Sequence, residues 1–183
     1  MPKITVIVPV FEHVKFITEC LNSLVDQTLD DWEAVIIDDG STDGSGQICN
    51  EFAKRDSRIK YYFQENKGIL RLSENFNMAL GLSSSDFIAV LEGDDFWPKD
   101  KLEKQIIGFT DPNVGLVWGN GEILIDGKNR PLRGYTGNFK ESTLQNYPLG
   151  IGLKALIFSH YFNMPTISVM YRREVLESIG GFY

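Results

Sequence analysis

The sequence of 183 residues contains only two cysteines and two histidines. Cys20 and Cys49 have no histidine or cysteine at metal-ligand spacing, so we expect both to be buried, reduced thiols. His13 and His160 are equally isolated in the sequence. We expect His13 to begin a helix and His160 to pack among aromatic side chains. We therefore expect no metal site built from histidine or cysteine.

Three common motifs of nucleotide-binding and hydrolytic enzymes are also missing. The sequence has no G-x-G-x-x-G that opens a helix, no G-x-x-x-x-G-K-[ST] loop and no G-x-S-x-G turn. These motifs hold dinucleotides, nucleoside triphosphates and a nucleophilic serine, respectively. Their absence argues against a nicotinamide-dependent Rossmann enzyme, a P-loop NTPase and a serine hydrolase.

Positive charge and long apolar runs are scarce as well. The 18 Lys and Arg residues face 25 Asp and Glu residues, which leaves a net charge of −7. This sign does not suit a protein that neutralises nucleic-acid phosphates, so we expect no nucleic-acid partner. No apolar run reaches the roughly 18 residues of a membrane span, and no signal-peptide cleavage site follows the first residues. These features predict a cytoplasmic protein, either free or at the cytoplasmic face of a membrane.

What the chain does contain is an alternation of apolar strands and amphipathic helices. Short runs rich in β-branched and aromatic residues predict strands at Ile4–Val8, Ala34–Ile37, Ile59–Phe63 and Phe87–Leu91, and weaker candidates lie at 114–118, 122–125 and 166–171. Helical spacing of apolar residues between the first four, beginning near Val14 in the first case, predicts crossover helices. This order is typical of a doubly wound, mostly parallel mixed sheet flanked by helices. We therefore predict an α/β fold and a single domain.

Three of the predicted strands are followed by segments that could carry chemistry. These segments are Pro9-Val10-Phe11-Glu12, Asp38-Asp39-Gly40-Ser41 and Glu92-Gly93-Asp94-Asp95-Phe96-Trp97. Each alone is explained as a strand end, a turn or a helix cap. Ligands of doubly wound sheets bind beyond the carboxyl ends of the strands, so we expect the three segments to share one edge. The carboxylates of Asp38, Asp39, Glu92, Asp94 and Asp95 would then lie along one edge and repel one another unless a cation compensates. This predicts Mg²⁺ or Mn²⁺.

Together the segments resemble the motifs of the family 2 glycosyltransferases, which have the GT-A fold. The matching segments are Ile4–Phe11, Ile36–Ser45, Asn66-Lys67-Gly68, Glu92–Trp97 with Lys101–Gln105, and Arg172-Arg173-Glu174 leading to Gly180-Gly181-Phe182. The resemblance covers nearly the whole chain. It implies metal-dependent transfer of a sugar, with inversion, from a nucleotide-diphospho-sugar to a hydroxyl of a saccharide or lipid-linked acceptor. UDP is the nucleotide we expect.

The resemblance also implies roles for individual residues. The nucleotide would be bound by Pro9, Phe11, Asp38, Asp39, Ser41, Asn66, Lys67, Gly68 and Asp94, and the metal by Asp95, Asp94 and Glu92. Trp97 is expected to pack behind the acidic segment. Three positions depart from the family, because Glu12 stands where Asn is common, Glu92 where Asp is common and Phe76 where Arg is common. The last departure leaves charge neutralisation at the diphosphate to the metal and to Lys67 or Arg71.

The general base of the reaction is not identified within the sequence. In the family, an aspartate that follows the Gly-Gly-Phe segment after a short interval serves this role, and no carboxylate follows Phe182 here. Glu174 and Glu177 are expected to pair with neighbouring arginines instead. The resemblance therefore implies a general base beyond Tyr183.

We accordingly expect the chain to be one glycosyltransferase domain that is truncated at its C-terminus. Residues 1–127, which carry the acidic excess, would form the half that binds the nucleotide-sugar donor. Residues 128–183 would begin the half that binds the acceptor.

Two other functions stay open on the sequence alone. A sugar-phosphate nucleotidyltransferase shares the α/β plan, but it needs a glycine-rich, basic loop after the first strand to hold a triphosphate. Residues 9–13 contain no glycine, arginine or lysine. A non-catalytic module that binds nucleotide-sugars is the third candidate.

Overall fold

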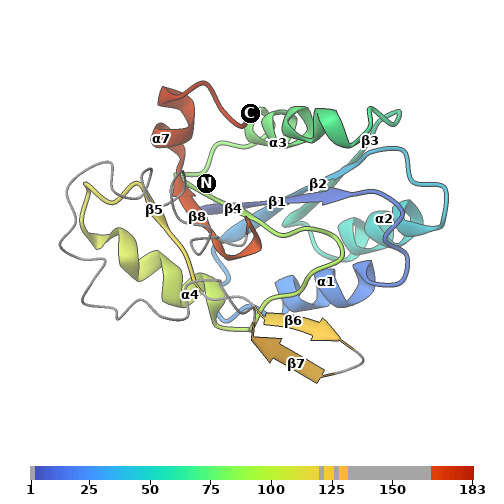
Figure 1. The fold of residues 1–183 in the computed structure, drawn as a ribbon, viewed down its shortest axis with the longest axis horizontal. Coiled ribbons are helices and arrows are strands. Elements are labelled where there is room, and N and C mark those ends of the chain that lie inside the picture. The colour runs from blue at the N-terminus through green and yellow to red at the C-terminus, as the bar shows by residue number, and fades with distance from the viewer. Residues whose placement is uncertain (1–2, 120–121, 126–127, 132–165) are drawn as a thin grey trace. The chain divides into compact units, whose positions relative to one another are not determined.

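A computed structural model of the chain describes residues 3–119, 122–125, 128–131 and 166–183 (Figure 1). Its strands are β1 (Ile4–Val10), β2 (Trp32–Asp38), β3 (Ile59–Phe63), β4 (Phe87–Val90), β5 (Leu116–Val117), β6 (Glu122–Ile125), β7 (Lys128–Pro131) and β8 (Met170–Arg172). Its α-helices are α1 (Ile17–Val25), α2 (Ser45–Arg55), α3 (Leu72–Gly81), α4 (Lys101–Ile106) and α7 (Arg173–Ser178). Three 3₁₀ turns are η1 (Ile69–Arg71), η2 (Ile107–Thr110) and η3 (Thr166–Ser168).

Six strands form one mixed sheet in the order β3-β2-β1-β4-β8-β5. The first four are parallel, and β8 runs antiparallel to both β4 and β5. Every residue of β1 and β2 is buried, because helices cover both faces of the sheet. The predicted doubly wound, mostly parallel fold is confirmed.

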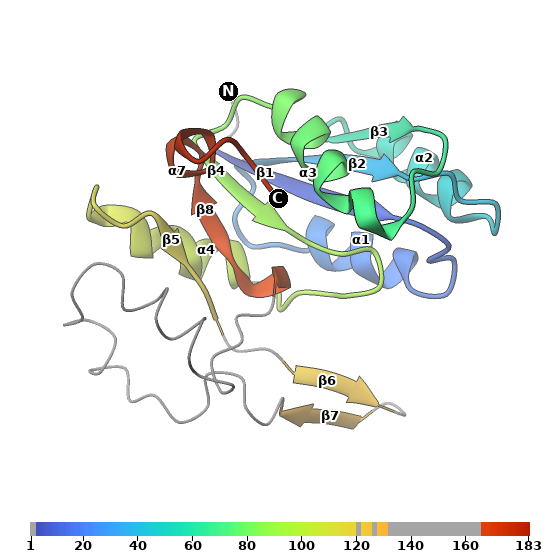
Figure 2. The same cartoon turned by 45° about the horizontal axis from the view of Figure 1, so that its top comes forward.

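The two faces of the sheet are covered by different helices (Figures 1 and 2). Ile4, Val6 and Val8 of β1 pack in a core with α1, α2 and α4, while Ile7 packs in a second core with α3 and α7. The crossovers that flank β1 therefore lie on opposite faces. Ligands of such sheets bind beyond the carboxyl ends of the strands where the strand order reverses, here at β1 and β4.

Three local predictions differ from the structure. Pro9 lies inside β1, and its carbonyl accepts a hydrogen bond from the Gly93 amide, which lies beyond the end of β4. Because β4 has ended at this level, the missing N–H of Pro9 removes no hydrogen bond between the two strands. The first helix begins at Ile17 instead of near Val14, and His13 lies in the preceding loop. The last strand is shorter than 166–171, because its beginning forms η3 and only Met170–Arg172 pairs with the sheet.

The chain divides into two compact units, Met1–Val117 with Met170–Tyr183, and Trp118–Val169. The first holds the six-stranded sheet, and the described part of the second holds the β6-β7 hairpin and η3. The expected donor and acceptor halves, 1–127 and 128–183, are a different division and stay a prediction. His160 lies outside the described residues. Among the residues described, no helix is long and apolar enough to cross a bilayer.

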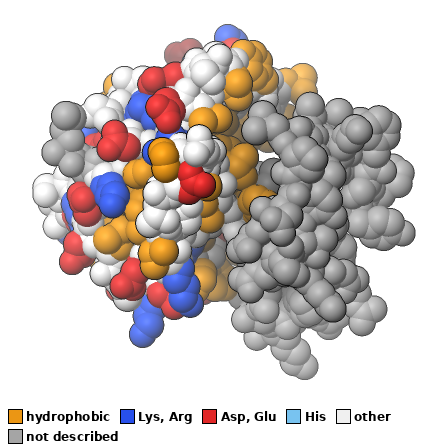
Figure 3. Space-filling view, turned by 90° about the vertical axis from the view of Figure 1, so that its left-hand side faces the viewer, with side chains coloured by type: hydrophobic (Ala, Val, Ile, Leu, Met, Phe, Trp, Pro, Cys, Tyr) orange, Lys and Arg blue, Asp and Glu red, His pale blue; other side chains and the backbone are white. Residues whose placement is uncertain are grey.

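Acidic and basic side chains are interspersed on the face of the first unit shown in Figure 3.

In α7 and the residue before it, each arginine has a glutamate partner, as expected. Arg172 Nε lies 3.5 Å from Glu174, and an Arg173 guanidinium nitrogen lies 3.6 Å from Glu177. Both glutamates are thus engaged by neighbouring cations.

Candidate nucleotide and metal site

The three chemistry-bearing segments meet at the carboxyl edge of the sheet. The amide of Asp39, after β2, donates to the Val10 carbonyl at 2.9 Å, and the amide of Gly93, after β4, donates to the Pro9 carbonyl at 3.1 Å. Both bonds end on the last residues of β1. The parallel strands thus bring the three segments together as the sequence predicted.

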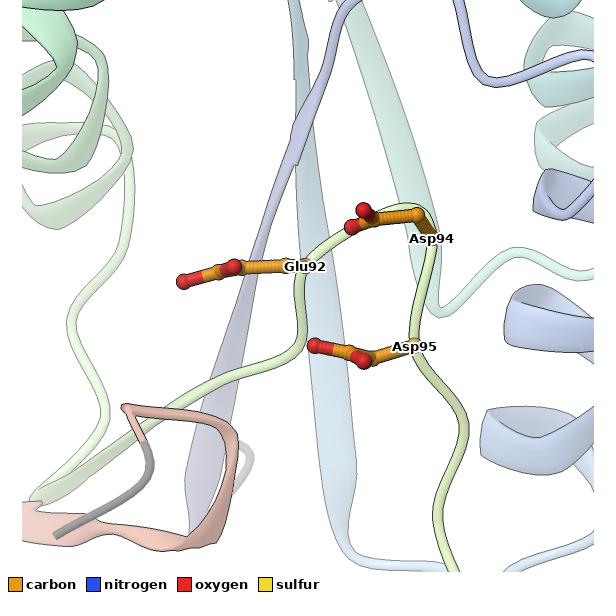
Figure 4. A group of neighbouring side chains, drawn as sticks. All are labelled: Glu92, Asp94 and Asp95. Carbon is orange, nitrogen blue, oxygen red and sulfur yellow. The ribbon is translucent and has the colours of Figure 1, made fainter. Parts of the chain in front are cut away.

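The acidic loop, Glu92–Asp95, presents three carboxylates on one side (Figure 4). One oxygen from each of Glu92, Asp94 and Asp95 lies within 4.8 Å of the others. Burial and the Asp94 carboxylate raise the pKa of Asp95 to about 6. Burial and the two aspartates raise the pKa of Glu92 as well. Ionisation of this cluster is therefore unfavourable without a compensating cation.

The cluster fits a divalent metal ion. No lysine or arginine in the described part of the chain forms an ion pair with any of the three carboxylates. Carboxylate oxygens are the ligands that Mg²⁺ and Mn²⁺ prefer, and Mg²⁺ uses one or two of them when phosphates complete its shell. The predicted metal residues Asp95, Asp94 and Glu92 are thus brought together with their charges uncompensated.

The carboxylates of the Asp38-Asp39-Gly40-Ser41 turn, by contrast, are engaged within the protein. Asp38 is fully buried and accepts hydrogen bonds from the Tyr61 hydroxyl at 2.7 Å and the Ser41 amide at 2.9 Å. Asp39 is also buried and accepts from the Gln64 side-chain amide at 2.6 Å. These two residues therefore shape the turn, and their free acceptor capacity is smaller than that of the acidic loop.

Asn66 and Lys67 of the Asn66-Lys67-Gly68 segment contact this turn directly, whereas a Cβ on Gly68 would meet no described atom within 4 Å. The Asn66 side chain donates to the Asp39 carbonyl at 2.9 Å, and the Lys67 amide donates to the Asp39 carboxylate at 3.2 Å. Gly40 has a φ of +83°, and a Cβ there would lie 2.8 Å from the Asn66 backbone nitrogen. Only glycine satisfies both constraints, which explains its place in the motif.

The two aromatic residues singled out in the sequence lie in different environments. Phe11 is 46% exposed at the carboxyl edge, whereas Trp97 is only 4% exposed and belongs to the core. The Lys101 ammonium lies 3.8 Å from the centre of the Trp97 ring and donates to Gln105 at 2.6 Å. Burial lowers the pKa of Lys101 to about 7. Phe11 is therefore available to a ligand, whereas Trp97 is part of the core and is covered by Lys101.

His13 is a residue of this site that the sequence did not single out. Its Nδ1 is buried and has no hydrogen-bond partner among the described residues. A Cβ on Gly93 would lie 2.5 Å from this atom, so the imidazole packs against the backbone of the acidic loop. The one sequence feature that could have indicated this contact is the glycine within Glu92–Asp95, because a residue without a Cβ leaves room for a neighbouring side chain. Cys20 contacts the same loop from α1, since its thiol donates to the Glu92 carbonyl at 3.5 Å.

Phe76, which stands where the family often has arginine, has a structural role. Its buried ring packs against Phe182 with ring centres 5.2 Å apart. The Asn77 side chain donates to the Phe182 carbonyl and accepts from the Phe182 amide, each at 2.8 Å. Helix α3 thereby holds the Gly-Gly-Phe segment.

The cations expected near the diphosphate, Lys67 and Arg71, share one partner. The Lys67 ammonium lies 3.5 Å from the Glu74 carboxylate, and the Arg71 guanidinium lies 2.5 Å from it. Both cations are at least one-third exposed. They are available to an anion only in competition with Glu74.

Comparison with known protein families shows which family the chain belongs to. Residues 5–180 match the model of "Glycosyl transferase family 2". The chain belongs to this family. Among curated relatives, "Glycosyltransferase GlyA" of Streptococcus pneumoniae serotype 4 is 43% identical over 118 residues, which is 64% of this chain and 16% of that protein. The uncharacterised glycosyltransferase alr2836 of Nostoc sp. is 30% identical over 181 residues, 97% of this chain and 53% of that protein. This family 2 chain thus spans about half or less of these two relatives.

Solved structures share the fold of this family 2 chain. The mannosyltransferase PcManGT from Pyrobaculum calidifontis, in complex with GDP-Man and Mn²⁺, superimposes on the whole chain with a TM-score of 0.72 at 24% identity, over 48% of its own length. Residues 1–349 of TarS from S. aureus, in complex with UDP, superimpose on 99% of the chain with a TM-score of 0.69 at 22% identity, over 50% of that structure. The GT-A fold is therefore confirmed.

Proposed function

We propose that the chain is the donor-binding part of an inverting, metal-dependent glycosyltransferase that uses a UDP-sugar. The acceptor we propose is a hydroxyl of a saccharide or of a lipid-linked intermediate in polysaccharide or glycoconjugate synthesis. The observation that carries this proposal is the unpaired carboxylate cluster of Glu92, Asp94 and Asp95. It lies at the carboxyl edge of the sheet, beside a turn built from Asp38 and Asp39.

In this proposal the nucleobase lies against the exposed face of Phe11, and Pro9 and Ser41 border the same pocket. Asp38 and Asp39 hold the turn in shape through their internal hydrogen bonds, and Asp39 presents its remaining acceptor sites. Asn66, Lys67 and Gly68 would close the pocket from the side of β3, because Asn66 and Lys67 bond to Asp39 and Asn66 lies against Gly40.

Glu92, Asp94 and Asp95 would hold Mn²⁺ or Mg²⁺, with Asp95 as the main ligand and Asp94 also close to the ribose or diphosphate. The ion supplies charge compensation for the departing diphosphate. The chain's own contribution is a loop fixed by the Gly93–Pro9 hydrogen bond and by the packing of Trp97, so the carboxylates are held on one side of the loop before the ligand arrives.

We propose that the general base lies outside residues 1–183, as the family resemblance implies. Two facts support this. Glu174 and Glu177 are each within 3.6 Å of an arginine, which engages their carboxylates. The chain also spans only about half of the Nostoc relative.

Two solved neighbours bear on the choice of nucleotide, since one was solved with UDP and another with GDP-Man and Mn²⁺. Incubation of the protein with radiolabelled UDP-sugars, GDP-sugars and nucleoside triphosphates tests donor and reaction together. We expect Mn²⁺-dependent binding of a UDP-sugar and slow release of UDP. Preference for a GDP-sugar would overturn only the choice of base.

The same assay separates the other candidate functions. Release of pyrophosphate from a triphosphate would indicate a nucleotidyltransferase, and metal-independent binding without any release would indicate a binding module. Asp95→Ala should abolish the metal-dependent binding. Asp26→Ala is the matched control, because Asp26 is exposed at the C-terminal end of α1 and its replacement removes the same charge.

A further inference from the structure

The two loops that border the proposed base pocket are joined by side-chain hydrogen bonds. They are the β1–α1 loop, residues 11–16, and the β2–α2 loop, residues 39–44. The Glu12 carboxylate accepts from the Thr42 amide at 2.7 Å and from the Thr42 hydroxyl at 3.0 Å. The Glu12 amide donates to the Ser41 hydroxyl at 3.0 Å. Glu12 thus takes part in three of the bonds between the loops.

A fourth bond continues the same seam. The Val14 amide donates to one oxygen of the Asp43 carboxylate at 2.9 Å, while the other oxygen accepts from the amide and hydroxyl of Ser45 at the beginning of α2. Asp43 therefore fixes both the β1–α1 loop and the first turn of the following helix. The seam connects the ends of two neighbouring parallel strands through residues about 30 positions apart in the sequence.

The backbone of Glu12 indicates that this contact holds the loop in an unfavourable conformation. Glu12 has a φ of +57° and is the one non-glycine residue with positive φ in the described part of the chain. This left-handed conformation is disfavoured for glutamate, so it persists only where other contacts hold it. The two hydrogen bonds to its charged carboxylate are of the stronger, charge-assisted kind.

The constrained conformation of Glu12 affects the residues on either side of it. Phe11 precedes it and is an exposed aromatic side chain at this edge, and the Ser41 hydroxyl accepts a hydrogen bond from the Glu12 amide. His13 follows it and packs against Gly93 of the acidic loop. Glu12, in its constrained conformation, therefore lies between the residue proposed to face the base and the residue that packs on the acidic loop.

We propose that Glu12 is a positioning residue for the nucleotide, which clamps the β1–α1 loop to the β2–α2 loop and so holds Phe11 in place before the ligand binds. The role rests on the proposed function, because it assigns the pocket beside Phe11 to a nucleobase. Glu12 contacts no ligand itself. It acts by reducing the ordering that nucleotide binding would otherwise require.

Titration calorimetry with UDP and MnCl₂ tests the proposal on Glu12→Ala, Glu12→Gln and Thr42→Val. Glu12→Ala loses the carboxylate acceptor and should bind UDP about tenfold more weakly, which is about 1.4 kcal/mol. Glu12→Gln keeps an acceptor oxygen and should remain within about threefold of the wild type. Thr42→Val removes only the hydroxyl bond and should lie between the two. Glu19→Ala, on the exposed side of α1, is the control for the change in charge.

Hydrogen exchange of the Thr42 amide distinguishes a local clamp from general destabilisation. We expect faster exchange of this amide in Glu12→Ala, while the amides of β1 and β2 keep their protection. Unchanged UDP affinity in Glu12→Ala, or an equal loss in Glu12→Gln, would overturn the role of Glu12. Slower or unchanged exchange at Thr42 would do the same. A wild-type protein that binds neither UDP nor GDP in MnCl₂ would instead refute the proposed function on which this role rests.

Discussion

Replacement of Asp95 by asparagine should stabilise the metal-free protein while it removes metal binding. The pKa of Asp95 is raised from 3.8 to about 6 by burial and by Asp94. A carboxyl group with a raised pKa favours the folded state when protonated, and this contribution is lost as the pH rises from about 4 to about 6. The full shift corresponds to about 3 kcal/mol, and we expect about 1 kcal/mol because Asp95 is partly solvated. The asparagine side chain carries no charge, so the Asp95→Asn variant avoids this loss.

Thermal unfolding in EDTA at pH 8 measures the effect. For a chain of this size, 1 kcal/mol shifts the Tm by about 2–4 °C, so Asp95→Asn should unfold that much higher than the wild type. The two should converge near pH 4, where the wild-type carboxyl is protonated. Excess MnCl₂ should raise the Tm of the wild type and leave the variant almost unchanged. Asp26→Asn is the matched control in both conditions.

The reasoning would be refuted by a lower Tm of Asp95→Asn in EDTA at pH 8. That result would mean that the ionised carboxylate forms stabilising contacts of its own. An equal rise of the Tm with MnCl₂ in wild type and variant would show that Asp95 is not a main ligand.

Four further substitutions test the surroundings of the site. Phe11→Ala should weaken UDP binding about tenfold with little change in Tm, whereas Trp97→Ala should destabilise the fold by about 3–5 kcal/mol, and matching effects in calorimetry and thermal unfolding would contradict this division. Gly93→Ala places a methyl group 2.5 Å from a buried imidazole nitrogen, so it should lower the free energy of unfolding in urea by about 1–3 kcal/mol and weaken Mn²⁺ binding. Wild-type values in both measurements would show that the acidic loop can shift. Asn77→Ala removes both hydrogen bonds to the Phe182 backbone and should speed proteolysis at the C-terminal segment, and unchanged cleavage would mean that ring packing alone holds it.

Local periodicity was enough to predict the first four strands and the fold class, whereas strand β7 (Lys128–Pro131) was not predicted. The strand Ile59–Phe63 has the predicted bounds, and the strands before and after it differ by a few residues at their ends. Element ends were less predictable because they depend on contacts from elsewhere in the chain. Helix α1 begins late because the preceding loop is held by Glu12, Ser41 and Asp43, and Met170–Arg172 is a strand because β4 and β5 pair with it.

The sequence by itself determined which segments share the functional edge, because parallel strands connected by helices bring their carboxyl ends to the same side of a sheet. It could not determine which carboxylates remain free there. Asp38 accepts hydrogen bonds from Tyr61 and Ser41, and Asp39 accepts one from Gln64. The acidic loop Glu92–Asp95, in contrast, has no cation partner among the described residues. The difference lies in partners that come close only when the strands are packed, so only the tertiary structure separates the carboxylates that build the site from those that are available to a metal ion.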